Sequence, residues 1–183
     1  MTGFERVSED LVHQGYIWRV TTARFRAPDG EEFERDVVRS PGAVGVVPLW
    51  FDAEGVPGVV LIRQYRAPYE AAIIEIPAGM RDIPGEPPET TARRELVEEI
   101  GMQAGALVHL LDMYPSPAMT DSITSIYLAT ELSACERDTH GPEERHMEVL
   151  NVSLAEALEW VVTGVIRDAK TVAGLLLAER RLR

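Results

Sequence analysis

The chain has 183 residues, of which 45% are hydrophobic and 26% charged, a composition typical of a globular protein with one substantial core. Its formal net charge of −12 argues against nucleic acid as a partner, because neutralising a phosphate backbone requires clustered Lys and Arg. No apolar run approaches the roughly 20 residues that span a bilayer, and the acidic N-terminus lacks a signal-peptide pattern, so we expect a cytoplasmic protein with no membrane partner. The single cysteine, Cys135, excludes an intrachain disulfide and suits a reducing compartment.

The first part of the chain predicts a small β-sheet. Its strands are expected at residues 16–20, 23–26 and 32–38, with a turn at Pro28-Asp29-Gly30. Two or three strands are too few to be stable alone, so we expect this sheet to pack on the rest of the chain or on another subunit. The Ser40-Pro41-Gly42 segment indicates a boundary between an N-terminal β-sheet region, 1–40, and a main domain, 41–183.

The main domain has a mixed pattern of strands and helices. Strands are expected at residues 44–50, 59–65, 73–76, 107–113, 122–129 and 147–152, and amphipathic helices at 154–162 and 170–182. A further helix lies between them, with Pro87 and Pro88 suited to its first turn and Gly101 to its C-terminal cap. This order predicts the α/β class.

That further helix carries three acids on one face. Glu95, Glu98 and Glu99 have the i,i+3 and i,i+4 spacing that brings side chains together on a helix surface. The acids repel one another unless they are simply solvated or bind a cation, and Mg²⁺ or Mn²⁺ is the natural candidate for oxygen ligands. The neighbouring apolar face, which would pack on the core, consists of Ala92, Leu96, Val97 and Ile100.

Residues 79–102 closely resemble the Nudix box, G-x5-E-x7-R-E-U-x-E-E-x-G-U, where U is a bulky aliphatic residue. Every fixed position from Glu86 onward matches, but six residues separate Gly79 from Glu86 where the pattern has five. The additional residue falls in a Pro-Gly loop that can bulge without shifting the helix. The resemblance implies an α/β/α sandwich with a mixed sheet, and Mg²⁺-dependent hydrolysis of a nucleoside diphosphate linked to another group.

The segments around the box look like those of ADP-ribose pyrophosphatases. They are Gln64-Tyr65-Arg66, Glu75-Ile76-Pro77-Ala78-Gly79, Tyr114-Pro115-Ser116-Pro117 and Asp168-Ala169-Lys170-Thr171. Pro117 lies fifteen positions past Met102, as in that subfamily, whereas Ala118 stands where relatives commonly have Gly. The resemblance implies that ADP-ribose is hydrolysed to AMP and ribose 5-phosphate.

Two alternatives to this activity stay open. One is hydrolysis of another substrate of the same form, such as a nucleotide sugar or a dinucleoside polyphosphate. The other is a sensor that binds ADP-ribose without cleaving it. The complete set of box carboxylates and the lack of a basic or helix-turn-helix appendage disfavour the sensor.

The resemblance also implies roles for residues in and near the box. Glu95 and Glu99 would be the primary metal ligands, joined by the backbone carbonyl of Ala78 and by Glu98 as a third carboxylate. Arg94 would orient the glutamates through bidentate hydrogen bonds. Glu86 would hold water molecules near the metal or brace the loop.

In the same subfamily an acidic loop in the C-terminal third supplies the general base. Here the loop is residues 136–148, and its strongest candidates are Glu143 and Glu144, of which we favour Glu144. His140 and His146 are the alternative bases, although loop histidines are more often exposed bystanders. Glu148 is expected to be structural.

The last implied features concern the substrate pocket. Trp18 or Ile17 would pack on the adenine ring, and Arg35 and Arg66 would contact the diphosphate or the terminal ribose. A core position is the alternative for Trp18, and Tyr65 and Tyr69 are expected to be packing residues. In the subfamily the small N-terminal sheet is exchanged across a homodimer and helps to form the neighbouring subunit's pocket.

Overall fold

A computed structural model describes residues 3–138 and 145–183. The chain forms two compact units. The first comprises Met1–Gly42 with Tyr114–Ile123, and the second comprises Ala43–Met113 with Thr124–Arg183. No helix in the described residues is both long and apolar enough to cross a membrane. The expected functional division into 1–40 and 41–183 stays a prediction.

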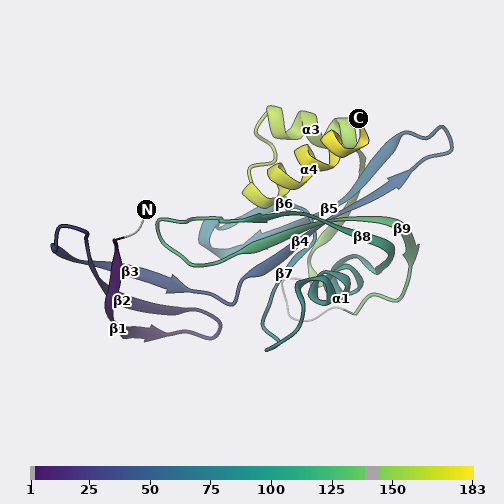
Figure 1. The fold of residues 1–183 in the computed structure, drawn as a ribbon. Coiled ribbons are helices and arrows are strands. Elements are labelled where there is room, and N and C mark those ends of the chain that lie inside the picture. The colour runs from purple at the N-terminus through teal and green to yellow at the C-terminus, as the bar shows by residue number, and fades with distance from the viewer. Residues whose placement is uncertain (1–2, 139–144) are drawn as a thin grey trace. The chain divides into compact units, whose positions relative to one another are not determined.

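The first unit contains a three-stranded antiparallel sheet with the order β1-β2-β3 (Figure 1). Its strands are β1 (Glu5–Gln14), β2 (Arg19–Arg26) and β3 (Glu32–Arg39). The expected turn between β2 and β3 is confirmed, and Gly30 occupies the left-handed region there with φ of 91°. The prediction of separate strands at residues 16–20 and 23–26 is wrong, because β2 is continuous and residues 15–18 form the turn after β1. Strand β1 was not predicted.

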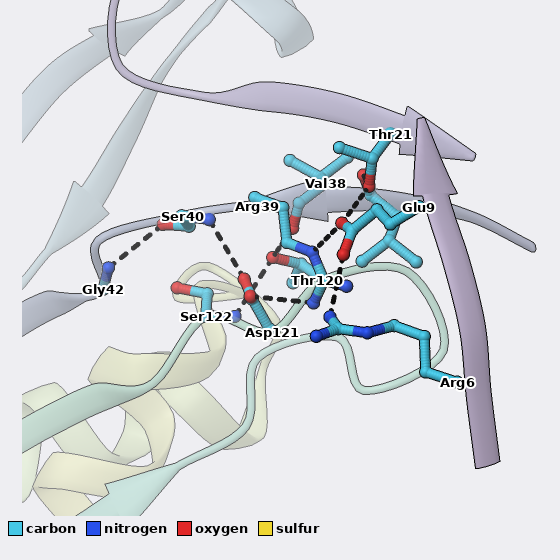
Figure 2. Close-up of polar contacts among 11 residues, drawn as sticks. Arg6, Glu9, Thr21, Val38, Arg39, Ser40, Gly42, Thr120, Asp121 and Ser122 are labelled. Atoms are coloured by element: carbon cyan, nitrogen blue, oxygen red, sulfur yellow. Dashed lines mark hydrogen bonds and ion pairs between the residues drawn. The ribbon is translucent and has the colours of Figure 1, made fainter. Parts of the chain in front are cut away.

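Residues 114–123 belong to the first unit because they bind to the end of β3. The amide of Val38 donates to the carbonyl of Met119 at 2.9 Å, and Thr120 Oγ1 donates to the Val38 carbonyl at 2.7 Å. Arg39 then joins two acids, with its Nε 2.7 Å from Glu9 Oε1 and its Nη1 3.0 Å from Asp121 Oδ2 (Figure 2). The loop that carries Pro117 is therefore attached to the N-terminal sheet.

The second unit is built on a seven-stranded mixed sheet with the order β10-β5-β4-β9-β8 (Figure 1). Strand β6 extends it beside β5, and β7 pairs with β4. Of the pairings between the described strands of this sheet, only β4–β9 is parallel. The strands are β4 (Ala43–Phe51), β5 (Pro57–Arg66), β6 (Ala71–Glu75), β7 (Ala78–Met80), β8 (Met102–Met113), β9 (Thr124–Ala134) and β10 (Glu148–Ser153), with the 3-10 helix η1 (Ala67–Tyr69) before β6. All six expected strands are present, and β8 begins five residues earlier than expected.

Helices cover both faces of this sheet. Helix α1 (Pro88–Ile100) lies on one face, and α3 (Leu154–Val162) and α4 (Ala169–Leu182) lie on the other (Figure 1). The strand residues alternate between two cores: Val60 and Ile62 pack with the α1 layer, while Val59 and Leu61 pack with the α3 and α4 layer. The α/β/α sandwich is thus confirmed.

Pro88 and Gly101 take the positions in α1 that the sequence predicts, whereas Pro87 lies just before the first turn. Pro87 is the N-cap residue and Pro88 opens the helix, where a missing N–H costs nothing. Gly101 ends it in the left-handed conformation, with φ of 63°. Leu96 and Ile100 are buried against the sheet, which fixes the rotation of α1 and so the direction of its acids.

Candidate active site

Two of the three acids on α1 are buried. Glu95 is 6% exposed and Glu99 is 3% exposed, while Glu98 is partly buried. The close approach of β7 contributes to this burial, because a Cβ on Gly79 would lie 2.0 Å from the Glu95 carboxylate. A side chain at position 79 would therefore displace the Glu95 carboxylate from its present position beside β7.

Arg94 holds together the acids around it. Its Nη1 donates to Glu95 Oε1 at 2.8 Å and to Glu98 Oε2 at 2.9 Å, and its Nη2 lies 3.4 Å from Glu86 Oε2. Burial opposes the charge on Arg94, but the neighbouring carboxylates raise the pKa of its guanidinium above the ordinary value. Glu86 is also fixed by the Thr91 hydroxyl, which donates to it at 2.8 Å.

Glu99 meets the start of β7. The amide N–H of Ala78 donates to Glu99 Oε2 at 2.8 Å, so the contact that the structure describes uses the amide and not the carbonyl expected as a metal ligand. In residues 3–138 and 145–183, no three Asp, Glu, His or Cys side chains converge as a group that could hold a metal. The donor set nevertheless suits a hard divalent cation, because buried carboxylates on adjacent helical turns supply only oxygen ligands.

A second polar cluster lies in the same unit and links three of the segments flanking the box. Arg66 donates to both carboxylate oxygens of Glu75, from Nε at 2.7 Å and from Nη2 at 2.8 Å. Lys170 donates to Oε2 of the same carboxylate. Burial would raise the pKa of Glu75, but these two cations outweigh it and lower the pKa below its ordinary value.

The same cluster is tied to the beginning of α4. Asp168 is the N-cap residue of this helix, and its carboxylate accepts hydrogen bonds from the amide and the hydroxyl of Thr171, at 3.0 and 2.6 Å. The Thr171 hydroxyl in turn accepts from the amide of Ile76 at 2.9 Å. The charge of Glu99 also contributes to the raised pKa of Arg66, so this acid of α1 acts electrostatically on the cluster.

Arg35 lies in the first unit and lines an open pocket of 580 Å³ with the Pro117 loop. Its guanidinium lies 4.7 Å above the Phe33 ring and donates to the Glu34 carbonyl at 2.7 Å. The described lining of this pocket is Arg6, Phe25, Arg35, Asp36, Val37, Arg39, Pro117, Ala118, Met119, Thr120 and Asp121.

Trp18 and Ile17 lie in the turn between β1 and β2 of the same unit. Trp18 is 54% exposed and Ile17 is half-buried, so the alternative that Trp18 is a core aromatic is wrong within this chain. Tyr65 and Tyr69 are also exposed, which corrects the expectation that they are packing residues.

The expected general base falls largely outside the described residues. Glu143, Glu144 and His140 lie in the segment 139–144, which the structure does not describe. His146 is exposed. Glu148 begins β10, where it accepts from Arg63 Nη1 at 2.9 Å in an ion pair with the neighbouring strand β5.

Glu75 and Lys170 were not predicted as site residues, although both lie in segments that resemble ADP-ribose pyrophosphatases. The sequence did indicate that Glu75 is unusual, because it is the one charged residue in the strand segment Ile73-Ile74-Glu75-Ile76. A charged side chain that is buried in such a strand requires a partner of opposite charge. The partner was not recognisable, since Lys170 lies 95 residues away.

Comparisons with known proteins identify the family and the fold. The NUDIX domain family matches residues 39–180. The ADP-ribose pyrophosphatase of Bacillus subtilis (strain 168) is 34% identical, over 90% of this chain and 86% of its own length. The ADP-ribose pyrophosphatase of Mycobacterium tuberculosis (strain ATCC 25618 / H37Rv) is 36% identical, over 94% and 82%. A crystal structure described as an ADP compounds hydrolase superposes with a TM-score of 0.84 at 22% identity, covering 100% of this chain and 95% of the other, which supports the fold.

Proposed function

The chain belongs to the Nudix family, and from this premise we propose that it hydrolyses the pyrophosphate bond of ADP-ribose to AMP and ribose 5-phosphate. The two relatives that are ADP-ribose pyrophosphatases support this substrate, because each aligns over at least 90% of the chain. The observation that carries the proposal is the pair of buried acids on α1, Glu95 and Glu99, in one unit with the Arg66–Glu75 ion pair. Acids suited to a cation and an arginine suited to an anion are what a diphosphate requires.

Nudix hydrolases generally need a divalent metal, and we propose Mg²⁺, with Mn²⁺ as a substitute. Its ligands would be Glu95, Glu99 and the carbonyl of Ala78, with Glu98 as a third carboxylate. When bound, the ion would neutralise charge on the diphosphate oxygens and make the attacking water more acidic. The contacts of Arg94 with Glu95 and Glu98 support a role in directing these carboxylates, and the Thr91 contact supports a bracing role for Glu86.

Two arginines and an apolar residue are the proposed substrate contacts. Arg66 would bind the diphosphate or the terminal ribose, since its bidentate contact with Glu75 fixes the guanidinium plane. Arg35 would bind the same groups, and its position in a pocket with the Pro117 loop supports this role. Trp18 or Ile17 would pack on the adenine, which requires the exposed ring that Trp18 has.

We propose Glu144 as the general base that takes the proton of the attacking water. Glu143, the neighbouring candidate of the same residue type, is the matched control. Glu144→Gln is expected to lower kcat by roughly 10²- to 10⁴-fold with little change in KM, because general-base assistance acts in the transition state. Glu143→Gln is expected to cost only a few-fold. Steady-state kinetics of both variants test the assignment, and the reverse order would transfer the role to Glu143.

We also propose a homodimer in which the N-terminal sheet helps to form the partner's pocket. Exposed apolar side chains on and beside β1 support it, because a sheet of three strands cannot bury them alone; they are Leu11, Val12, Tyr16 and Trp18. Light scattering at micromolar concentration is expected to give the dimer mass, and removal of residues 1–40 is expected to harm both assembly and substrate affinity. A fully active monomer would contradict the proposal.

A substrate panel tests the proposed activity against its alternatives. ADP-ribose, a nucleotide sugar and a dinucleoside polyphosphate are each incubated with the protein and Mg²⁺, and kcat/KM is compared. The highest value is expected for ADP-ribose. A higher value for another compound would assign that substrate class, and binding of ADP-ribose in calorimetry without any hydrolysis would identify a sensor.

A further inference from the structure

Lys170 stands out among the basic residues of the chain. It is the only lysine among 18 Lys and Arg residues, so every other basic position is an arginine. It also lies in the first turn of α4, where the helix dipole disfavours a positive charge. A cation at an unfavourable position, of a type used nowhere else in the chain, indicates a specific local requirement.

The surroundings of Lys170 define that requirement. Its side chain is 14% exposed, and its Nζ contacts Glu75 Oε2 and lies 3.0 Å from Asp168 Oδ2. The aliphatic stem passes over Gly45 of β4, where an added Cβ would lie 3.7 Å from Lys170 Cδ and 3.0 Å from a methyl group of Ile76. The space suits a slender stem with a compact ammonium group more than the planar guanidinium of arginine.

Lys170 also affects how far Glu75 neutralises the positive charge of Arg66. Glu75 is 2% exposed and binds Arg66 through both oxygens, so these two groups alone would neutralise each other. With Lys170 on the same carboxylate, two cations share one anion. Asp168, 3.0 Å from Lys170 Nζ, balances the second cation, so Lys170 acts on Arg66 by competing for the Glu75 oxygen Oε2 that both cations contact. Arg66, with its side chain 36% exposed, therefore keeps positive charge on its accessible side.

We propose that Lys170 is a positioning residue for the substrate diphosphate. It fixes the Glu75 carboxylate, and through it the direction and the net positive charge of the Arg66 guanidinium, without touching the substrate itself. This inference rests on the proposed role of Arg66 in binding the diphosphate. It adds the start of α4 to the substrate site, through the chain of contacts Asp168–Lys170–Glu75–Arg66.

A double-mutant cycle tests this role. Lys170→Gln removes the charge, Lys170→Arg keeps it, and Arg66→Met removes the group on which Lys170 acts; KM and kcat for ADP-ribose are measured for each. Lys170→Gln is expected to raise KM about tenfold with little change in kcat, the effect of one unit charge at the effective dielectric constant of proteins. In the Arg66→Met background the same substitution is expected to change KM by less than about twofold, because the intermediary is absent. Lys170→Arg is expected to raise KM less than Lys170→Gln.

Arg167→Met is the matched control, since Arg167 is exposed three residues earlier and donates only to the Gly164 carbonyl, at 2.7 Å, among the described contacts. All variants are compared below their unfolding temperatures, measured in parallel. An unchanged KM in folded Lys170→Gln and Lys170→Arg proteins would overturn the inference, and so would an equal rise of KM in both Arg66 backgrounds. If the wild-type enzyme releases no AMP from ADP-ribose, the proposed function fails separately, and the cycle is run with whichever diphosphate substrate of the panel it hydrolyses.

Discussion

Glu99→Gln is expected to lower kcat by on the order of a hundredfold or more while the protein stays folded. The substitution keeps the size of the side chain and an oxygen that can accept the Ala78 amide, but it removes the charge that a divalent cation requires. Glu95→Gln is expected to have a similar effect, since Glu95 is buried on the preceding turn of α1. Steady-state rates with saturating Mg²⁺ measure both changes.

Glu89→Gln on the same helix is the control for this prediction. Glu89 forms an exposed ion pair with Arg93, at 3.0 Å, and exposed pairs contribute little to stability. Its removal is expected to leave kcat within about twofold, as for surface changes remote from the chemistry. Near-normal activity of folded Glu99→Gln protein would refute the metal-ligand assignment.

Glu75→Gln is expected to produce the largest loss of stability among the substitutions discussed. The amide cannot balance two cations, so Arg66 and Lys170 would repel each other beside an apolar core. Removing one partner of a buried ion pair lowers the free energy of unfolding by about 3–5 kcal/mol. Because Arg66 is partly exposed, we expect a loss at or below the lower end of this range. A loss of about 2–3 kcal/mol corresponds to a Tm lower by roughly 4–12 °C for a chain of this length.

The pH dependence of this stability follows from the lowered pKa of Glu75. A carboxyl group whose pKa is lower in the folded state contributes stability that is complete above its ordinary value of 4.5 and is lost as the pH falls through the folded value. Thermal unfolding of the wild type is therefore expected to lose stability below pH 4.5 more steeply than that of Glu75→Gln. Parallel pH profiles of the two proteins would contradict the ionised state of Glu75.

Local signals were sufficient to predict α1, α3, α4 and six strands of the second unit, while the short strand β7 was not predicted. Pro88 begins α1 and Gly101 caps its C-terminal end. The spacing of Glu95 and Glu99 places both acids on the side of the helix that faces β7. Continuous apolar runs in β4 and β5 likewise predicted strands, and these strands are buried on both faces. These features are encoded within a few residues of one another.

Features that depend on distant contacts were not predictable in the same way. Strand β1 is mostly polar and exposed, so it has no apolar alternation and is defined by its hydrogen bonds with β2. Residues 114–123 belong to the first unit because Met119 and Thr120 form hydrogen bonds with the backbone of Val38. No pattern of side chains in the sequence predicts these contacts. The Glu75–Lys170 ion pair joins segments 95 residues apart and emerges only when α4 packs on the sheet.

The products formed from ADP-ribose test the central claim most directly. The wild-type protein is incubated with ADP-ribose and Mg²⁺, and the products are separated by chromatography, with Glu99→Gln protein as the control for contaminating activity. Equal amounts of AMP and ribose 5-phosphate are expected from the wild type, with at least about a hundredfold less from the variant. Intact ADP-ribose after prolonged incubation, or the same AMP release from both proteins, would contradict the proposal that the acids of α1 support pyrophosphate hydrolysis.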